Sequence, residues 1–253
     1  MNPTYILLLA AFLCLPLRAP AQRTQQPVPT QAMRERAMQV LQRCENVDEM
    51  GKYDPASCYG QHVIAGVNAA KHQRWNDVIS QETDAITLLV ADRQRVFHGI
   101  GPGTPGGTQF LAAPYIIRAA AYEATKQYSL AISDATSAIA ITPADPVPWN
   151  DRCWNRAITG NLAGALQDCQ KARQLAPKSA YVLDSTGFVY LKMKNYPEAI
   201  SSYQAALALQ PKSASSLYGL GLAEQALGNQ TQGAQHIATA QQIDPQIATN
   251  FGT

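Results

Sequence analysis

The sequence predicts an all-α protein built as a stack of antiparallel helix pairs, and three observations lead to this fold class. Prolines recur every 34 residues, at Pro143, Pro177, Pro211 and Pro245. Small residues recur with the same period, which would let two helix backbones approach each other closely. Turn-forming segments divide each repeat into two halves. Each repeat is therefore predicted to be a helix, a tight turn and a second helix that ends at proline.

Four columns define the repeat when its copies start at residues 112, 146, 180 and 214. The first column holds large apolar residues: Tyr115, Trp149, Leu183 and Leu217. The other three hold small residues: Ala119, Cys153, Gly187 and Gly221; Ala131, Ala165, Ala199 and Gly233; Ala138, Ala172, Ala206 and Ala240. The predicted turns lie at residues 125–127, 159–161, 194–195 and 228–229.

This pattern resembles the tetratricopeptide repeat (TPR) family. The copy at 180–213 carries the family pattern best, in Leu183, Gly187, Tyr190, Tyr196, Ala199, Tyr203, Ala206 and Pro211. A more degenerate copy starts at residue 59, with Gly66, Ala69, Trp75, Val78 and Ala85 at the corresponding places. The resemblance implies a right-handed superhelical solenoid of five repeats. It also implies that the first helix of each repeat lines a concave surface.

A helical apolar stripe precedes the repeats, formed by Met33, Ala37, Val40, Leu41 and Cys44. The predicted divisions are a signal peptide at 1–21, a flexible lead-in at 22–30, an N-terminal capping helix and loop at 31–58, a degenerate repeat at 59–92, a Gly/Pro-rich insertion at 93–111, repeats at 112–145, 146–179, 180–213 and 214–247, and a C-terminal tail at 248–253.

The N-terminal residues predict export. Residues 5–17 form an uncharged apolar run of 13 residues, which is the length of a signal-peptide core and shorter than the roughly 20 residues of a membrane-spanning helix. The A-x-A cleavage pattern Ala19-Pro20-Ala21 follows and would make Gln22 the first mature residue. No Lys or Arg precedes the run, and Arg18 lies near the cut. We expect a periplasmic or secreted protein with no membrane span after cleavage.

Four cysteines remain after such a cleavage: Cys44, Cys58, Cys153 and Cys169. An even number in an exported chain suggests two disulfides, with three possible connectivities. A Cys44–Cys58 bridge would close a short polar loop and attach the N-terminal helix to the solenoid. A Cys153–Cys169 bridge would cross one helix pair, and two buried thiols are the alternative for this pair.

Composition and motifs argue against several classes of function. Twenty Lys and Arg face 18 Asp and Glu, so the net charge of +2 gives no reason to expect nucleic acid as a partner. Residues 101–106 match G-x-G-x-x-G, but they contain two prolines and lack the βαβ context of a dinucleotide site. The histidines and carboxylates show neither a metal-ligand spacing nor a catalytic pattern. We therefore expect no catalytic residues, no cofactor and no metal.

The first helices of three repeats supply the candidate binding residues. They form one stripe beside the core: Asn150, Trp154, Tyr181, Asp184, Phe188, Leu191, Tyr218 and Leu222. Trp154, Phe188 and Leu222 occupy one column, and they either form an apolar groove or pack on one another between repeats. TPR proteins often bind peptides on this face, but the cations that hold a terminal carboxylate in some of them are missing here.

The sequence therefore predicts a non-catalytic exported TPR scaffold that binds a protein or peptide segment in its apolar concave groove. One alternative is a structural subunit of a cell-envelope assembly that uses the ends of the solenoid, with oligomer formation through the C-terminal repeat. Another is an enzyme that uses the insertion as a lid.

Overall fold

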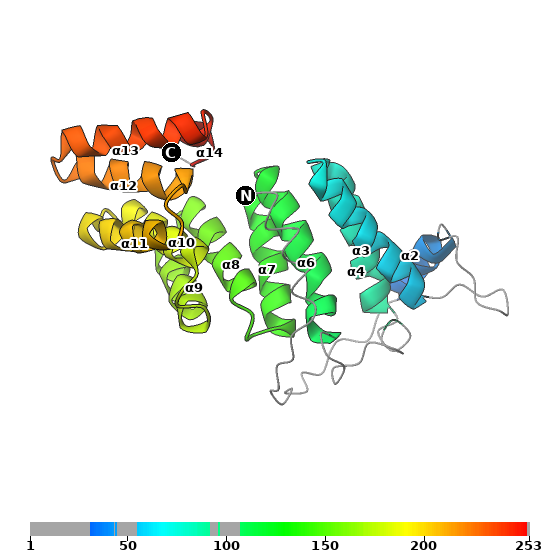
Figure 1. Cartoon of the computed structure of the whole chain (residues 1–253). Coiled ribbons are helices and arrows are strands. Elements are labelled where there is room, and N and C mark those ends of the chain that lie inside the picture. Colours follow the sequence, from blue (N-terminus) through cyan, green and yellow to red (C-terminus); the bar gives the residue numbers. More distant parts are fainter. Residues whose placement is uncertain (1–30, 43, 45–54, 92–95, 97–106, 252–253) are drawn as a thin grey trace. The chain divides into compact units, whose positions relative to one another are not determined.

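All secondary structure in the described part of the chain is α-helical. The computed structural model describes residues 31–42, 44, 55–91, 96 and 107–251 (Figure 1). The predicted all-α fold of antiparallel helix pairs is confirmed. The predicted signal peptide, the lead-in and residues 93–95 and 97–106 of the insertion lie outside the described residues. Within the described residues, no helix has the length and apolar character needed to cross a bilayer.

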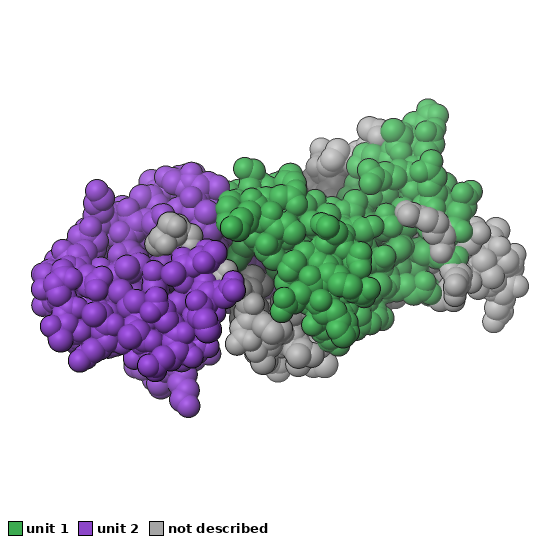
Figure 2. All heavy atoms as spheres, turned by 90° about the horizontal axis from the view of Figure 1, so that it is seen from above, with its two compact units in different colours: residues 1–142 green, residues 143–253 purple. Residues whose placement is uncertain are grey.

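The chain divides into two compact units, residues 1–142 and 143–253, coloured separately in Figure 2. The helices of unit 1 are α2 (Gln31–Gln42), α3 (Pro55–Lys71), α4 (Trp75–Ala91), α6 (Gly107–Ala124) and α7 (Tyr128–Ile141). Those of unit 2 are α8 (Pro146–Ile158), α9 (Leu162–Leu175), α10 (Ala180–Lys192), α11 (Tyr196–Leu209), α12 (Ala214–Ala226), α13 (Gln230–Ile243) and α14 (Ile247–Asn250). Each unit is described by itself below.

The helix pairs are closed by turns that repeat with the 34-residue period. Lys126, Gly160, Lys194 and Gly228 all take a left-handed backbone, with φ between 59° and 92°. This conformation reverses the chain within a few residues, so each second helix packs against its first. Glycine adopts it without strain, which explains its presence at two of the four turns.

Local capping residues begin the first helices of unit 2. The side chains of Asp145, Ser179 and Ser213 accept hydrogen bonds from backbone N–H groups in the first turns of α8, α10 and α12. A capping side chain of this kind stabilises a helix by about 1 kcal/mol. The sequence thus specifies the start of each helix that carries the predicted binding stripe.

Two predicted divisions differ from the helices. The helix α6 begins at Gly107, five residues before the repeat predicted at 112–145, so the end of the predicted insertion is helical. The longer helix is favoured because Leu111 is buried and the Phe110 carbonyl accepts a hydrogen bond of 2.7 Å from the Tyr59 hydroxyl. Likewise α3 begins at Pro55, which places Cys58 inside the helix rather than in a loop before it.

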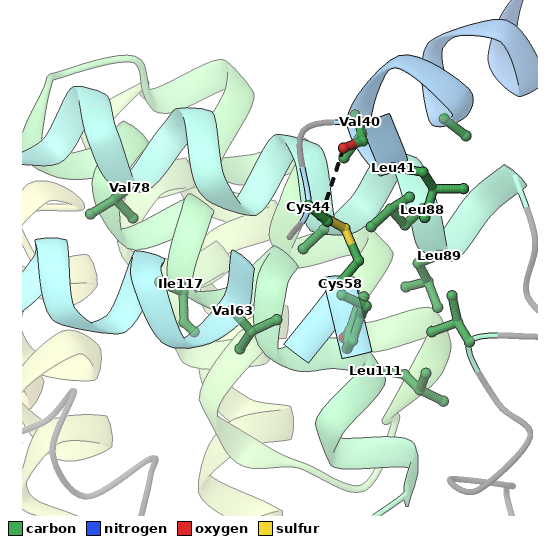
Figure 3. Close-up of a cluster of buried hydrophobic side chains, with 14 of the residues drawn as sticks. Val40, Leu41, Cys44, Cys58, Val63, Val78, Leu88, Leu89, Leu111 and Ile117 are labelled. Carbon is green, nitrogen blue, oxygen red and sulfur yellow. Dashed lines mark hydrogen bonds between the residues drawn. A yellow bond between two sulfur atoms is a disulfide. The ribbon is translucent and has the colours of Figure 1, made fainter. Parts of the chain in front are cut away.

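Each unit has its own apolar core. In unit 1 the core surrounds Cys44 and Cys58 and includes Val40, Leu41, Leu88 and Leu89 (Figure 3). In unit 2 it runs along α8, α10 and α12 and ends at Phe251, just after α14. The predicted tail at 248–253 therefore contributes a core residue, Phe251.

Candidate protein-binding surface

The predicted binding stripe lies on the three first helices of unit 2. The helices α8, α10 and α12 are successive neighbours, because α10 contacts both of the others. Residues four apart on a helix lie on one face, so the stripe continues from helix to helix. The structure brings most of the predicted residues close together, although several are more deeply buried than an open groove would allow.

Aromatic rings form the centre of this stripe. The rings of Trp154 and Phe188 are 4.3 Å apart between centroids, at an interplanar angle of 32°. Phe188 is fully buried, whereas Trp154, Leu191 and Leu222 are half-buried. Two of the three members of the predicted apolar column therefore retain surface that a partner could contact.

Phe251, which directly follows α14, covers Phe188. Its ring lies 5.2 Å from the Phe188 ring and 5.1 Å from the Tyr218 ring, in edge-to-face arrangements at 86° and 66°. Such aromatic pairs contribute about 0.5–1.5 kcal/mol each beyond the area they bury. Only 1% of the Phe251 surface is exposed. The stripe thus already holds one aromatic side chain, delivered by a short segment of the same chain.

The polar residues of the stripe are buried as well. The Asp184 carboxylate accepts a hydrogen bond from the Ser216 hydroxyl, across the contact between α10 and α12. Burial raises the pKa of Asp184 to about 6, while hydrogen bonds from Ser216 and Ser215 act in the opposite direction. Tyr181 is half-buried and donates a hydrogen bond of 3.2 Å to Asp151. These contacts join neighbouring repeats.

Asn150 differs from the other members of the stripe. It is fully buried, and neither its amide nitrogen nor its amide oxygen has a hydrogen-bond partner among the described residues. An unpaired buried amide costs about 1–3 kcal/mol. Its burial places it beneath the surface rather than at the position of a contact residue.

Unit 1 contains a buried acid of a different kind. Glu82 is fully buried, and neither of its carboxyl oxygens has a hydrogen-bond partner among the described residues. Burial raises the pKa of Glu82 to about 9, although the positive charge of Arg118 acts in the opposite direction. The group is therefore neutral at pH 7. Such a shift is common at catalytic sites, but this carboxyl is enclosed by the core and does not reach solvent.

Both predicted cysteine pairs lie at bonding distance. Cys44 and Cys58 form a disulfide with 5.8 Å between their Cα atoms, and Cys153 and Cys169 form one with 5.3 Å. The second pair connects α8 with α9, within one repeat. Of the described residues, Cys44, Cys58 and His62 are the one set of cysteine, histidine and carboxylate side chains with ligand atoms close enough for a metal ion.

Comparison with known proteins agrees with this architecture. A sequence model described as "TPR repeat" matches residues 187–228, which run from α10 to the turn after α12. The repeated helix pairs and this match identify the fold. The chain has the TPR fold.

Proteins similar to this chain match it at low sequence identity. The small glutamine-rich tetratricopeptide repeat-containing protein 2 of Mycosarcoma maydis is 25% identical over 115 residues, which cover 46% of this chain and 33% of the relative. The chain thus spans about a third of the length of the curated relative it matches. A thermophilic TPR protein of Thermus thermophilus superimposes with a TM-score of 0.57 at 16% identity, over 76% of this chain and 94% of that one. MamA of Desulfovibrio magneticus RS-1 does so with a TM-score of 0.55 at 13% identity, over 76% and 96%.

Two residues of this surface were not predicted from the sequence. Phe251 lies 34 residues after Leu217 and so continues the column of large apolar residues, a signal that was present in the sequence. Lys192 lies outside the predicted stripe, and its ammonium is 5.6 Å from the centre of the Phe188 ring. The surface therefore combines aromatic rings with a positive charge at one edge.

Proposed function

We propose that this TPR protein is a non-catalytic scaffold that binds a protein segment on the stripe of unit 2, where an aromatic side chain of the partner takes the place of Phe251. The packing of Phe251 between Phe188 and Tyr218 carries the proposal. It supports a surface that accepts an aromatic residue from a short segment of chain. Trp154, Leu191 and Leu222 are half-buried and offer their remaining apolar surface to the neighbouring residues of the partner.

A peptide of the chain's own last residues, Gln-Ile-Ala-Thr-Asn-Phe-Gly-Thr, tests the surface directly. We expect the full chain carrying Phe251→Ala to bind this peptide, labelled with a fluorophore, because the aromatic position is then vacant. The natural chain should bind it more weakly, since Phe251 competes. A control peptide with alanine in place of phenylalanine should lose at least tenfold in affinity, because buried aromatic anchors contribute about 2 kcal/mol or more.

Two further variants separate binding from folding. Adding Trp154→Ala to Phe251→Ala should weaken peptide binding without loss of helicity, because Trp154 is half-buried and its neighbours stay packed. Leu130→Ala is a matched control, because Leu130 is an exposed apolar residue of α7 in unit 1. Equal binding of both peptides, or equal binding by the Trp154→Ala chain, would rule out this surface.

A second candidate function is assembly through the C-terminal repeat. The helix α13 buries only Gly233 and Ala240, while Leu227 and Ile243 expose nearly half of their surface. These residues could join copies of the chain or a larger structural assembly. Light scattering over a range of concentrations tests this function, since Ile243→Ser with Leu227→Ser should dissolve such an oligomer and leave peptide binding unchanged.

We further propose that the protein is exported and acts in the periplasm or outside the cell. The apolar run at 5–17, the Ala19-Pro20-Ala21 pattern and the two disulfides support this location. The intact mass of protein from the extracytoplasmic fraction tests it. A mature chain that begins at Gln22 and carries two disulfides is expected, whereas an uncleaved chain with four free thiols would refute it.

A further inference from the structure

The disulfide of unit 1 lies beside a histidine that is oriented by a second side chain. The Nε2 atom of His62 is 3.7 Å from the Cys44 sulfur, and its Nδ1 atom is 2.7 Å from the Gln81 amide oxygen. When Nδ1–H donates to this oxygen, Nε2 carries the free lone pair and faces the sulfur. A carbonyl acceptor on the far nitrogen is the usual way in which proteins orient a histidine for a metal.

We propose that reduction of the Cys44–Cys58 bond converts Cys44, Cys58 and His62 into a site for a thiophilic divalent metal ion of the Zn²⁺ type. Their ligand atoms all lie within 4.8 Å of one another. Two ligands of one tetrahedral Zn²⁺ are about 3.5–3.8 Å apart, given metal–ligand distances of about 2.0–2.3 Å. The separation of His62 Nε2 from Cys44 Sγ already has this value.

The conversion needs little movement of the backbone. Once the bond is broken, the two sulfur atoms must separate to about 3.8 Å to become neighbouring ligands. The Cα atoms of Cys44 and Cys58 are 5.8 Å apart, which allows this separation through side-chain rotation. His62 and Gln81 are half-buried, so the ion has a route from solvent on their side, and a water molecule can supply the fourth ligand.

The chemistry of the two steps balances with a dithiol or phosphine reductant. The reductant transfers two electrons to the Cys44–Cys58 bond and is itself oxidised, a dithiol to its disulfide and a phosphine to its oxide. The two sulfurs take up two protons, which the dithiol supplies or which come from the water molecule whose oxygen the phosphine gains. The metal ion then binds both sulfurs as thiolates and the neutral His62 imidazole, and it releases those two protons to solvent. The disulfide and the metal site are therefore alternative states of the same residues.

Either state holds the N-terminal helix in place. Cys44 follows α2, and Cys58 and His62 lie on α3, while Val40 and Leu41 of α2 are buried in the core of unit 1 (Figure 3). A disulfide attaches α2 to α3 in an oxidising compartment, and a bound metal ion would do so in a reducing one. The site thus gives this capping helix a second means of attachment that depends on redox conditions.

Metal titration of the full chain tests the proposal. The chain is reduced with a phosphine, freed of reductant without oxygen, and titrated with Zn²⁺ against a chromogenic chelator; Cd²⁺ then reports thiolate ligands through its charge-transfer absorbance. We expect one ion per reduced chain and none per oxidised chain. Cys44→Ser should abolish tight binding, and His62→Ala should weaken it at least tenfold. Gln81→Leu should weaken it by about 10–100-fold, as is typical of residues that orient a ligand.

Matched controls assign the ion to these residues. His72→Ala removes an exposed histidine just after α3, and the pair Cys153→Ala with Cys169→Ala removes the other cysteines; both should bind Zn²⁺ as the natural chain does. Circular dichroism of each reduced variant shows whether the helices persist. No binding by the reduced natural chain, undiminished binding by folded His62→Ala, or loss of binding in the Cys153/Cys169 variant would overturn the proposal.

Discussion

The helix pairs α8/α9 and α10/α11 hold their two helices together by different chemistry at the same two positions of the repeat. In α8/α9 the facing residues are Cys153 and Cys169, which form a disulfide. In α10/α11, 34 residues on, they are Gly187 and Tyr203. A Cβ atom on Gly187 would lie 2.9 Å from the Tyr203 ring, so the glycine makes room for the tyrosine. The repeat thus keeps the volume between the helices filled, although the residues that fill it differ.

A second pair of positions shows the same divergence. Arg152 donates two hydrogen bonds, of 2.9 and 2.7 Å, to the Asp168 carboxylate, and joins α8 to α9. The equivalent residues of α10/α11 are Thr186 and Ser202, which carry no charge. One repeat therefore uses an ion pair and a covalent bond, whereas the next relies on an aromatic side chain packed against glycine. This difference predicts unequal responses to mutation, pH and reductant.

The largest effect is expected from Asp168→Ala in α9. Asp168 is buried and also accepts a hydrogen bond of 2.7 Å from Arg156, so its removal leaves two guanidinium groups without their carboxylate. Loss of one partner of a buried ion pair costs about 3–5 kcal/mol. Urea denaturation should show a loss of this size in the free energy of unfolding. The exposed pair Arg74–Asp77 is the control, since Arg74→Ala should cost less than about 1 kcal/mol; a similar cost would contradict the assignment.

The disulfide of α8/α9 is expected to contribute nearly as much. Its cysteines are 16 residues apart, and closing a loop of this length stabilises a fold by about 3 kcal/mol in the chain-entropy model. The double variant Cys153→Ala, Cys169→Ala restores the alanines that Ala119 and Ala135 hold one repeat earlier. The variant should therefore fold, and under oxidising conditions its free energy of unfolding should be about 3 kcal/mol below that of the natural chain. When both proteins are fully reduced, at Cys44–Cys58 and in the natural chain also at Cys153–Cys169, their free energies of unfolding should agree within about 1 kcal/mol. A loss that persists under reducing conditions would point to packing instead.

The sequence predicted the repeat, its turns and its helix pairs because these depend on local signals with a fixed period. It did not predict how the facing positions are filled, since an ion pair such as Arg152–Asp168 depends on contacts 16 residues apart and on burial. The column containing Trp154 and Phe188 left two interpretations open, and the structure shows both packing and residual exposure there. Phe251 was missed because an assignment of residues 248–253 to a tail ignored the continuing period. Its burial was therefore predictable from its place in the column of large apolar residues, whereas its contacts with the Phe188 and Tyr218 rings were not.

The pH dependence of stability sharpens the comparison between buried carboxylates. Burial raises the pKa of Asp184 in α10 from 3.8 to about 6. The folded protein therefore binds a proton at Asp184 more tightly than the unfolded chain does. As a result, the contribution of Asp184 to the free energy of unfolding falls as the pH rises from about 4 to 6 and is constant above pH 6. The cost amounts to about 3 kcal/mol.

Asp184→Asn should abolish this component. The free energy of unfolding of the variant minus that of the natural chain should rise by about 2–3 kcal/mol between pH 4 and pH 7, as measured by urea denaturation at each pH. The hydrogen bond from Ser216 to the side-chain oxygen can be kept by asparagine, so the two proteins should differ little at pH 4. A difference that does not change with pH would show that Asp184 is ionised in the folded protein even at the lower pH.

The smallest effect is expected from Tyr203→Phe in α11. Tyr203 is fully buried, and its hydroxyl has no hydrogen-bond partner among the described residues. Burial, with the negative charge of Asp184, raises the pKa of this hydroxyl, so it is neutral under ordinary conditions. Removing an unpaired buried hydroxyl relieves a desolvation cost, while the ring that fills the space beside Gly187 stays. The variant should therefore be as stable as the natural chain or up to about 1 kcal/mol more stable.

Tyr59→Phe is the matched control, because Tyr59 is equally buried but donates a hydrogen bond of 2.7 Å to the Phe110 carbonyl. Its loss should cost about 0.5–1.5 kcal/mol. In thermal denaturation, the melting temperature of Tyr59→Phe should fall, whereas that of Tyr203→Phe should rise or stay unchanged. A larger fall for Tyr203→Phe would reveal that its hydroxyl binds a partner such as water.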